Sequence, residues 1–208
     1  MDFAGVFETH FTIGLDGASG IDALRDWGQA RGLKCLHILL DRGASPSQPM
    51  LTHRGSGDLA SELRIANDLS RQLEASGFRV TRIKIEAACT NRDVPATDAE
   101  AMAHPELYFE HHVKLLLEPQ TDMAPLASLA QEHGAHLSRN ALTTRPDGRE
   151  ERFVTQRCCL VGRQVARRRL DALLNSLKLN GYPVLDIEEE FVVLDTNGAI
   201  DAGWIEVS

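Results

Sequence analysis

The sequence has few of the residues that cross-link small proteins. It contains four cysteines, and no two of them form a Cys-x-x-Cys pair. The adjacent Cys158 and Cys159 would point to opposite faces of a strand. This spacing argues against a structural zinc site and against a disulfide framework. We therefore expect buried or half-buried free thiols.

Positive charge is also scarce. The chain has 22 Lys and Arg residues against 30 Asp and Glu residues, which gives a formal net charge of −8. Nucleic-acid-binding proteins usually carry an excess of Lys and Arg, so the composition predicts no nucleic-acid partner. No apolar run reaches the roughly 18 residues of a membrane span, and the first residues lack the pattern of a signal peptide. We expect a cytoplasmic protein without a membrane partner.

The remaining composition is that of a globular protein. Hydrophobic residues make up 43% of the chain and charged residues 25%, both near the average for folded domains. Domains commonly have about 100 to 150 residues, so 208 residues fit one domain or two small ones. Either arrangement can bury a hydrophobic core.

The clearest feature is an internal repeat. The segment 7–13 aligns with 109–115 at an offset of 102 residues, and both begin with Phe-Glu. Segment 51–54 aligns with 154–157 at an offset of 103, and Gly77 aligns with Gly181 at 104. The offset drifts by only two residues along the copy, which indicates a tandem duplication.

Hydrophobic periodicity gives both copies the same order of elements. In the first copy we predict strands at 6–13, 35–41, 48–54 and 79–87, with helices at 21–31 and 58–75. In the second copy we predict strands at 108–117, 136–144, 152–159 and 184–194, with helices at 123–133 and 163–179.

This order is that of the ferredoxin-like βαββαβ fold, a four-stranded antiparallel sheet with two helices on one face. We predict an α+β protein with one such repeat at 1–88, a linker at 89–106 and a second repeat at 107–208. The second repeat has a C-terminal extension, in which 204–207 is expected to add a short strand. Each sheet leaves one face uncovered, so the two copies should either pack these faces together or join their sheets edge to edge.

Strand alternation selects the side chains on the uncovered faces. Phe7 and Phe11 should face the helices, which leaves Glu8 and His10 on the open face. The second copy repeats this pattern with Glu110 and His112. The same alternation on the other strands adds candidate ligand-binding residues, namely Thr12, Thr52, Arg54, Lys84, Glu86, Lys114, Thr155, Arg157, Glu188 and Glu190.

The repeated Glu-x-His pattern suggests chemistry, because residues two apart on a strand lie about 7 Å apart and can converge on one ligand. Glu8, His10, Glu110 and His112 would suit a divalent metal such as Zn, Mn or Fe as the cofactor. His10 and His112 could alternatively act as catalytic acid and base. The Arg and Lys residues of the same faces suit a phosphate or a carboxylate. An ordinary solvated sheet face remains the simpler interpretation.

Two short motifs resemble known families. His10-Phe11-Thr12-Ile13 resembles the H-x-T-x motif of the 2H phosphoesterases, duplicated proteins that use two such histidines on cyclic phosphodiesters; the second copy has Lys114 in place of the threonine. Glu110-x-His112-x-Lys114 is similar to the E-x-E-x-K strand of the triphosphate tunnel metalloenzymes, with His112 in place of the middle Glu. Each likeness covers a few residues of one strand and assigns no family.

Two functional hypotheses follow. The first is an enzyme, hydrolase or phosphoesterase-like, that binds a small anionic ligand in a groove between the repeats, with or without a divalent metal. The second is a non-catalytic ligand-binding or oligomerisation module, for which a homodimer is one arrangement. Metal content and mass in solution would discriminate between them.

Overall fold

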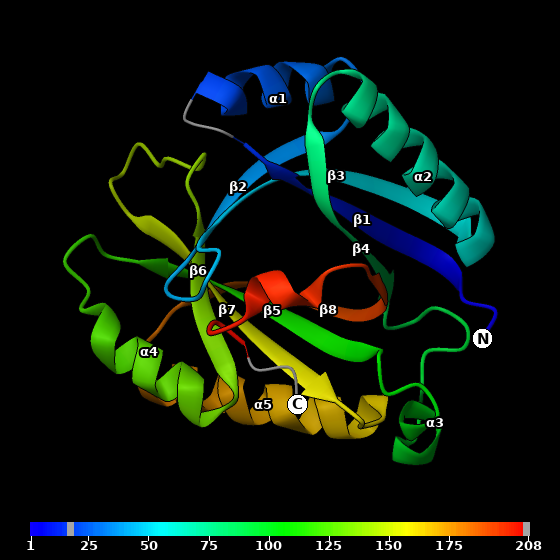
Figure 1. Ribbon diagram of the computed structural model, residues 1–208. Helices are drawn as coiled ribbons and strands as arrows, with labels where there is room; N and C mark the ends of the chain where they lie inside the picture. Colours follow the sequence, from blue (N-terminus) through cyan, green and yellow to red (C-terminus); the bar gives the residue numbers. More distant parts are fainter. Residues whose placement is uncertain (16–18, 206–208) are drawn as a thin grey trace.

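The computed structural model describes residues 1–15 and 19–205, and it contains the βαββαβ order twice (Figure 1). The protein is therefore an α+β tandem duplication of a ferredoxin-like unit. The first repeat consists of β1 (Ala4–Gly14), α1 (Ser19–Gln29), β2 (Lys34–Leu40), β3 (Ser47–Asp58), α2 (Leu59–Ala75) and β4 (Arg79–Ala88). The second consists of β5 (Tyr108–Leu117), α4 (Met123–Glu132), β6 (Ala135–Asn140), β7 (Glu150–Cys159), α5 (Arg163–Leu179) and β8 (Val184–Asp195).

The two sheets join edge to edge at both sides and close into one antiparallel barrel. The strand order around the barrel is β1-β3-β2-β6-β7-β5-β8-β4. One seam pairs β2 with β6 over Ile38–Leu40, and the other pairs β4 with β8 over Lys84–Ala88. Closure removes every free sheet edge, which an open sheet would have to protect. It also turns the two uncovered faces toward each other inside the barrel.

The helices cover the outside of the barrel. In Figure 1, α1 and α2 lie over one side and α4 and α5 over the opposite side. The outward side chains of β1 form the core beneath the helices, as the strand alternation predicts: Phe7 is 1% exposed and Phe11 is fully buried. The outer cluster that contains them also includes Phe109 and Phe191, so one hydrophobic core connects the two repeats.

Most element boundaries agree with the sequence-based expectation to within one or two residues, and the differences have local causes. β3 continues to Asp58, because Gly55–Gly57 stay paired with the start of β1. β6 ends at Asn140 instead of 144, because the Asn140 side chain accepts a hydrogen bond from Leu142 N and turns the chain. The segment between the repeats contains the short helix α3 (Asp98–Met102), which begins with a capping box between Thr97 and Glu100.

Of the predicted strand at 204–207, the two residues that the structure describes, Trp204 and Ile205, are not in a strand. A short 3₁₀ helix, η1 (Gly198–Asp201), is followed by a turn through Ile205, and residues 206–208 lie outside the described residues. Trp204 and Ile205 are buried against Leu40, and the Trp204 indole donates a hydrogen bond to Leu137 O. Hydrophobic packing, this hydrogen bond and the ion pairs of Asp201 therefore hold the described part of the segment against the barrel.

Candidate functional site

The barrel interior contains a cavity of about 220 Å³ that both repeats line. Glu8 and His10 reach it from β1, and Glu110 and His112 reach it from β5. The structure thus brings the two Glu-x-His motifs into one shared space, because closing the barrel places both uncovered faces inside it.

The two histidines have equivalent surroundings. His10 Nδ1 lies 2.9 Å from the Thr52 hydroxyl, and His112 Nδ1 lies 3.1 Å from the Thr155 hydroxyl. These pairs follow from the strand register, in which His10 is opposite Thr52 and His112 is opposite Thr155. On its other side, His10 Nε2 lies 2.6 Å from Glu86. Both threonines therefore orient the imidazole rings toward the interior.

The two glutamates of the motifs are each paired with an arginine from the neighbouring strand. Arg54 Nε donates to Glu8 at 2.5 Å, and Arg157 donates to Glu110 at 2.9 Å. The two pairs differ in burial: the Arg54 side chain is 63% exposed, whereas that of Arg157 is 2% exposed and stacks over the Tyr108 ring. The second pair is therefore part of the protein interior.

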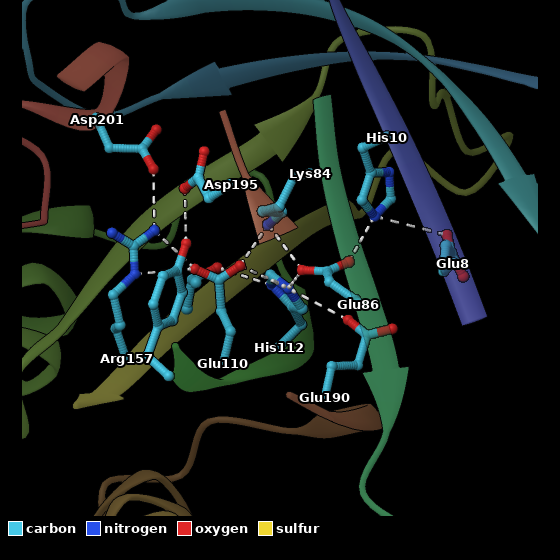
Figure 2. Close-up of polar contacts among 12 residues, drawn as sticks. Glu8, His10, Lys84, Glu86, Glu110, His112, Arg157, Glu190, Asp195 and Asp201 are labelled. Carbon is cyan, nitrogen blue, oxygen red and sulfur yellow. Dashed lines mark hydrogen bonds and ion pairs between the residues drawn. The ribbon is translucent and has the colours of Figure 1, made fainter. Parts of the chain in front are cut away.

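These groups belong to one continuous network of ion pairs, which we call the inner network; Figure 2 shows most of its members. Lys84 connects Glu86 to Glu110, and Arg157 connects Glu110 to Asp201. The network contains the carboxylates Glu8, Glu86, Glu110, Glu188, Glu190, Asp195 and Asp201, the cations Arg54, Arg82, Lys84 and Arg157, and the histidines His10 and His112.

Carboxylates outnumber Lys and Arg in the inner network, and the pKa shifts reflect this excess. Burial raises the pKa of Glu110, but Lys84 and Arg157 outweigh it and hold that pKa at about 2. Burial, followed by the charges of Glu86 and Glu8, raises the pKa of Glu190 well above its usual range. Burial lowers the pKa of His112, but Glu86 and Glu110 raise it overall. The network therefore tends to take up positive charge.

The repeats differ at several inner positions, among them the one opposite each histidine. Lys84 is opposite His10 on β4, and Glu188 is opposite His112 on β8. These two residues are equivalent in the duplication but have opposite charges. As a result, Glu86 has Lys84 Nζ at 2.7 Å, whereas its counterpart Glu190 has no Lys or Arg partner among the described residues.

The apolar side chains of the lining lie on the opposite side of the cavity, and we call them the apolar wall: Leu36, Ile38, Leu40, Met50, Phe153 and Trp204, from β2, β3, β7 and the C-terminal segment. Polar side chains also line this side, among them Lys34, Gln48, Ser138, Asn140 and Glu151. The cavity therefore has one charged wall, from β1, β4, β5 and β8, and one apolar wall. Such a division suits a small molecule with a polar end and an apolar body.

The remaining predicted ligand-binding residues occupy different places in this arrangement. Thr12, Lys84, Lys114, Thr155, Glu188, Glu190 and Arg54 line the cavity, while Thr52, Glu86 and Arg157 contact the lining residues. Lys114 lies 3.9 Å from Glu151 and over the Phe153 ring. The cations expected to hold an anion are each paired with carboxylates, so these pairings do not support a directly bound anion.

The structure gathers a different set of potential metal ligands from the predicted one. Among the described residues, Glu86, His112 and Glu190 place ligand atoms within 4.8 Å of one another. The predicted set was Glu8, His10, Glu110 and His112. Glu8 and Glu110 are instead held by arginines, and both His10 ring nitrogens have partners.

Sequence reasoning missed Asp195 and Asp201. Asp195 accepts from Arg82 and from the Tyr108 hydroxyl, and Asp201 is bonded by Arg82 and Arg157. Asp201 lies in the C-terminal extension, which has no counterpart in the first repeat. The available signal was Arg82, which strand alternation places on the uncovered face and which, once buried there, requires an acidic partner.

Within the described part of the chain, no helix is long and apolar enough to cross a membrane. No protein-family model matches the chain, and no curated protein is similar to it in sequence. Among solved structures, the small subunit of acetolactate synthase from Thermotoga maritima is similar over 92% of this chain and 96% of that chain. The sequence identity is 12% and the TM-score is 0.32, values that show neither a family nor a function.

Proposed function

We propose that this protein binds a small amphiphilic molecule inside the barrel and holds it without transforming it. The observation that carries the proposal is the division of the cavity into a charged wall and an apolar wall. In the absence of other ions, the ligand would place a positively charged group near Glu190 and His112 and its apolar part against Leu36 and Phe153.

The excess of carboxylates in the inner network supports a cationic end. A positive group near Glu190 would neutralise a carboxylate that otherwise has only His112 at 3.7 Å. An anionic ligand would instead approach several carboxylates in a poorly solvated space, where repulsion between like charges is strong. The hydrogen bonds of His10 favour ligand binding without catalysis, because both of its ring nitrogens already have protein partners.

Two probes of similar size and opposite charge test this proposal. We expect 2-phenylethylammonium to bind the metal-free chain at least about tenfold more tightly than phenylacetate, because like charges across an interface are strongly disfavoured. Isothermal titration calorimetry at neutral pH measures both affinities.

A cavity-filling variant provides the control. Leu36→Trp should abolish binding of 2-phenylethylammonium, since Leu36 lines the apolar wall. Its circular dichroism spectrum and thermal transition should show that the variant still folds. Equal binding of the two probes, or unchanged binding by Leu36→Trp, would contradict the proposal.

Catalysis by His112 is the second candidate function, and one observation favours it. Its Nε2 lies at the cavity, 3.6 Å from Glu110 and 3.7 Å from Glu190, without a hydrogen bond to any described residue. An imidazole in this position can exchange a proton with a ligand. Turnover of a cyclic nucleotide or inorganic triphosphate by the wild type, and its loss in His112→Gln, would favour this candidate over holding.

A further inference from the structure

A buried carboxylate directly behind the cavity lining has one oxygen without a well-aligned hydrogen bond. Glu86 is 1% exposed, and its Oε2 is 2.6 Å from His10 Nε2. Its Oε1 is buried and forms an ion pair with Lys84 Nζ at 2.7 Å, but accepts no hydrogen bond of good geometry from the described residues. A carboxylate oxygen has two lone pairs, so this atom can accept a further partner beside Lys84.

His112 and Glu190 lie beside this oxygen. His112 Nε2 is 4.0 Å from Glu86 Oε1 and 3.7 Å from Glu190 Oε2, and the ligand atoms of the three residues lie within 4.8 Å of one another. These separations are too long for hydrogen bonds. Two ligands at about 2.1 Å from a tetrahedral ion lie roughly 3.4 Å apart, so small side-chain rotations would bring the three atoms around a common centre.

The residues behind these ligands hold them in place. The Thr155 hydroxyl lies 3.1 Å from His112 Nδ1 and can accept a hydrogen bond from the protonated Nδ1. In that tautomer Nε2 carries no proton and can act as a metal ligand. His10 fixes Glu86 through Oε2, so that Oε1 turns away from His10. Partners of this kind commonly orient metal ligands and fix the histidine tautomer.

The charges favour the same position. Every other carboxylate of the inner network faces an Arg or Lys, whereas Glu190 faces only His112 among the described residues. Lys84 can remain on Glu110 when a cation approaches Glu86, because it already contacts both carboxylates. The ion would replace Lys84 at Glu86 Oε1, and Lys84 would keep its ion pair with Glu110.

We propose that Glu86, His112 and Glu190 bind one divalent transition-metal ion, with its other coordination positions open to the cavity. Mixed nitrogen and oxygen ligands suit Zn²⁺ or Mn²⁺. This inference deepens the proposed function and rests on it for the ligand class. A bound ion makes the charged wall of the cavity positive near Glu190. The metal-loaded chain should therefore bind a ligand with a carboxylate or another anionic group.

Metal binding is measured first and without any organic ligand. The full chain, stripped with a chelator, is titrated with Zn²⁺ and separately with Mn²⁺ by calorimetry, and we expect one ion per chain. Glu190→Gln keeps the shape of the side chain and should weaken metal binding at least about tenfold. Thr155→Val should weaken metal binding by about tenfold, because the His112 imidazole loses the hydrogen bond that orients it. Glu189→Gln, on the same strand but outside the inner network, should stay within about twofold of the wild type, because Glu189 pairs with Arg167 and is not one of the three ligands.

The two probes then separate the inferences. Phenylacetate should bind the metal-loaded chain at least about tenfold more tightly than the stripped chain, by the same charge argument. If the stripped wild type binds neither ion stoichiometrically, or if Glu190→Gln and Glu189→Gln behave alike, the metal site is wrong, and the binding of 2-phenylethylammonium still tests the cavity. If the ion binds but neither probe does, the cavity function is wrong and the metal site stands.

Discussion

Replacing Arg157 with methionine should lower the free energy of unfolding by about 3 kcal/mol, because it removes hydrogen bonds to two buried carboxylates, each of which keeps one other cationic partner, Lys84 for Glu110 and Arg82 for Asp201. The Arg157 side chain is 2% exposed and donates hydrogen bonds to both Glu110 and Asp201. Methionine preserves most of the packing of the side-chain stem. The decrease in the free energy of unfolding therefore reports the contribution of the charge and its hydrogen bonds. Urea unfolding followed by circular dichroism gives the value.

The duplication provides a matched control. Arg54 occupies the equivalent position of the first repeat and pairs with Glu8, but its side chain is 63% exposed. Exposed ion pairs contribute little, so Arg54→Met should cost less than about 1 kcal/mol. Similar losses in the two variants would mean that the second repeat does not bury its ion pair as described.

Phe191→Ala should cost about 3 to 5 kcal/mol, the usual range for removing a buried phenylalanine side chain from a core. Phe191 is 1% exposed, and its ring lies 4.7 Å from that of Phe109 and 5.9 Å from that of Phe3. It therefore packs residues from both ends of the chain into one core. Because the repeats share this core and two strand seams, the variant should still unfold in a single transition.

The control for this variant lies on the same strand. Ile187 is on the same outward side of β8 but is 39% exposed, so Ile187→Ala should cost less than about 1 kcal/mol. Two separated transitions in the Phe191→Ala chain, one for each repeat, would contradict the shared core. Equal losses in both variants would contradict the described burial.

The sequence predicted the fold well because its signals are local and occur twice. The alternation around Phe7 and Phe109 determines which side of β1 and β5 faces the helices, and the buried outer core confirms it. Edge-to-edge joining of the sheets was one of two arrangements left open, but their closure into a barrel was not predicted. It depends on pairing between β2 and β6, a contact between segments about 100 residues apart, and no local pattern specifies such a contact.

The site was harder to predict than the fold. Strand parity identified Glu86, His112 and Glu190 as inward residues, but parity says nothing about which inward residues are already paired. The predicted metal ligands Glu8 and Glu110 lie opposite Arg54 and Arg157 across the strands, and those pairings depend on register. The contribution of β2 to the apolar wall was not predicted, because β2 was interpreted as a strand buried on both faces and neither face was assigned to a cavity.

The opposite charges of Lys84 and Glu188 matter for the symmetry of the molecule. Two identical subunits around a twofold axis would carry the same residue at both positions, so any binding site beside one would recur beside the other. A single chain that contains both copies is free of this constraint, since each half can change separately. Lys84 pairs with Glu86 of its own repeat and with Glu110 of the other, whereas Glu188 places a further carboxylate opposite His112. The consequence is a cavity with two distinguishable ends, in which a ligand would have one preferred orientation; a symmetric assembly of half-length subunits would offer two equivalent ones.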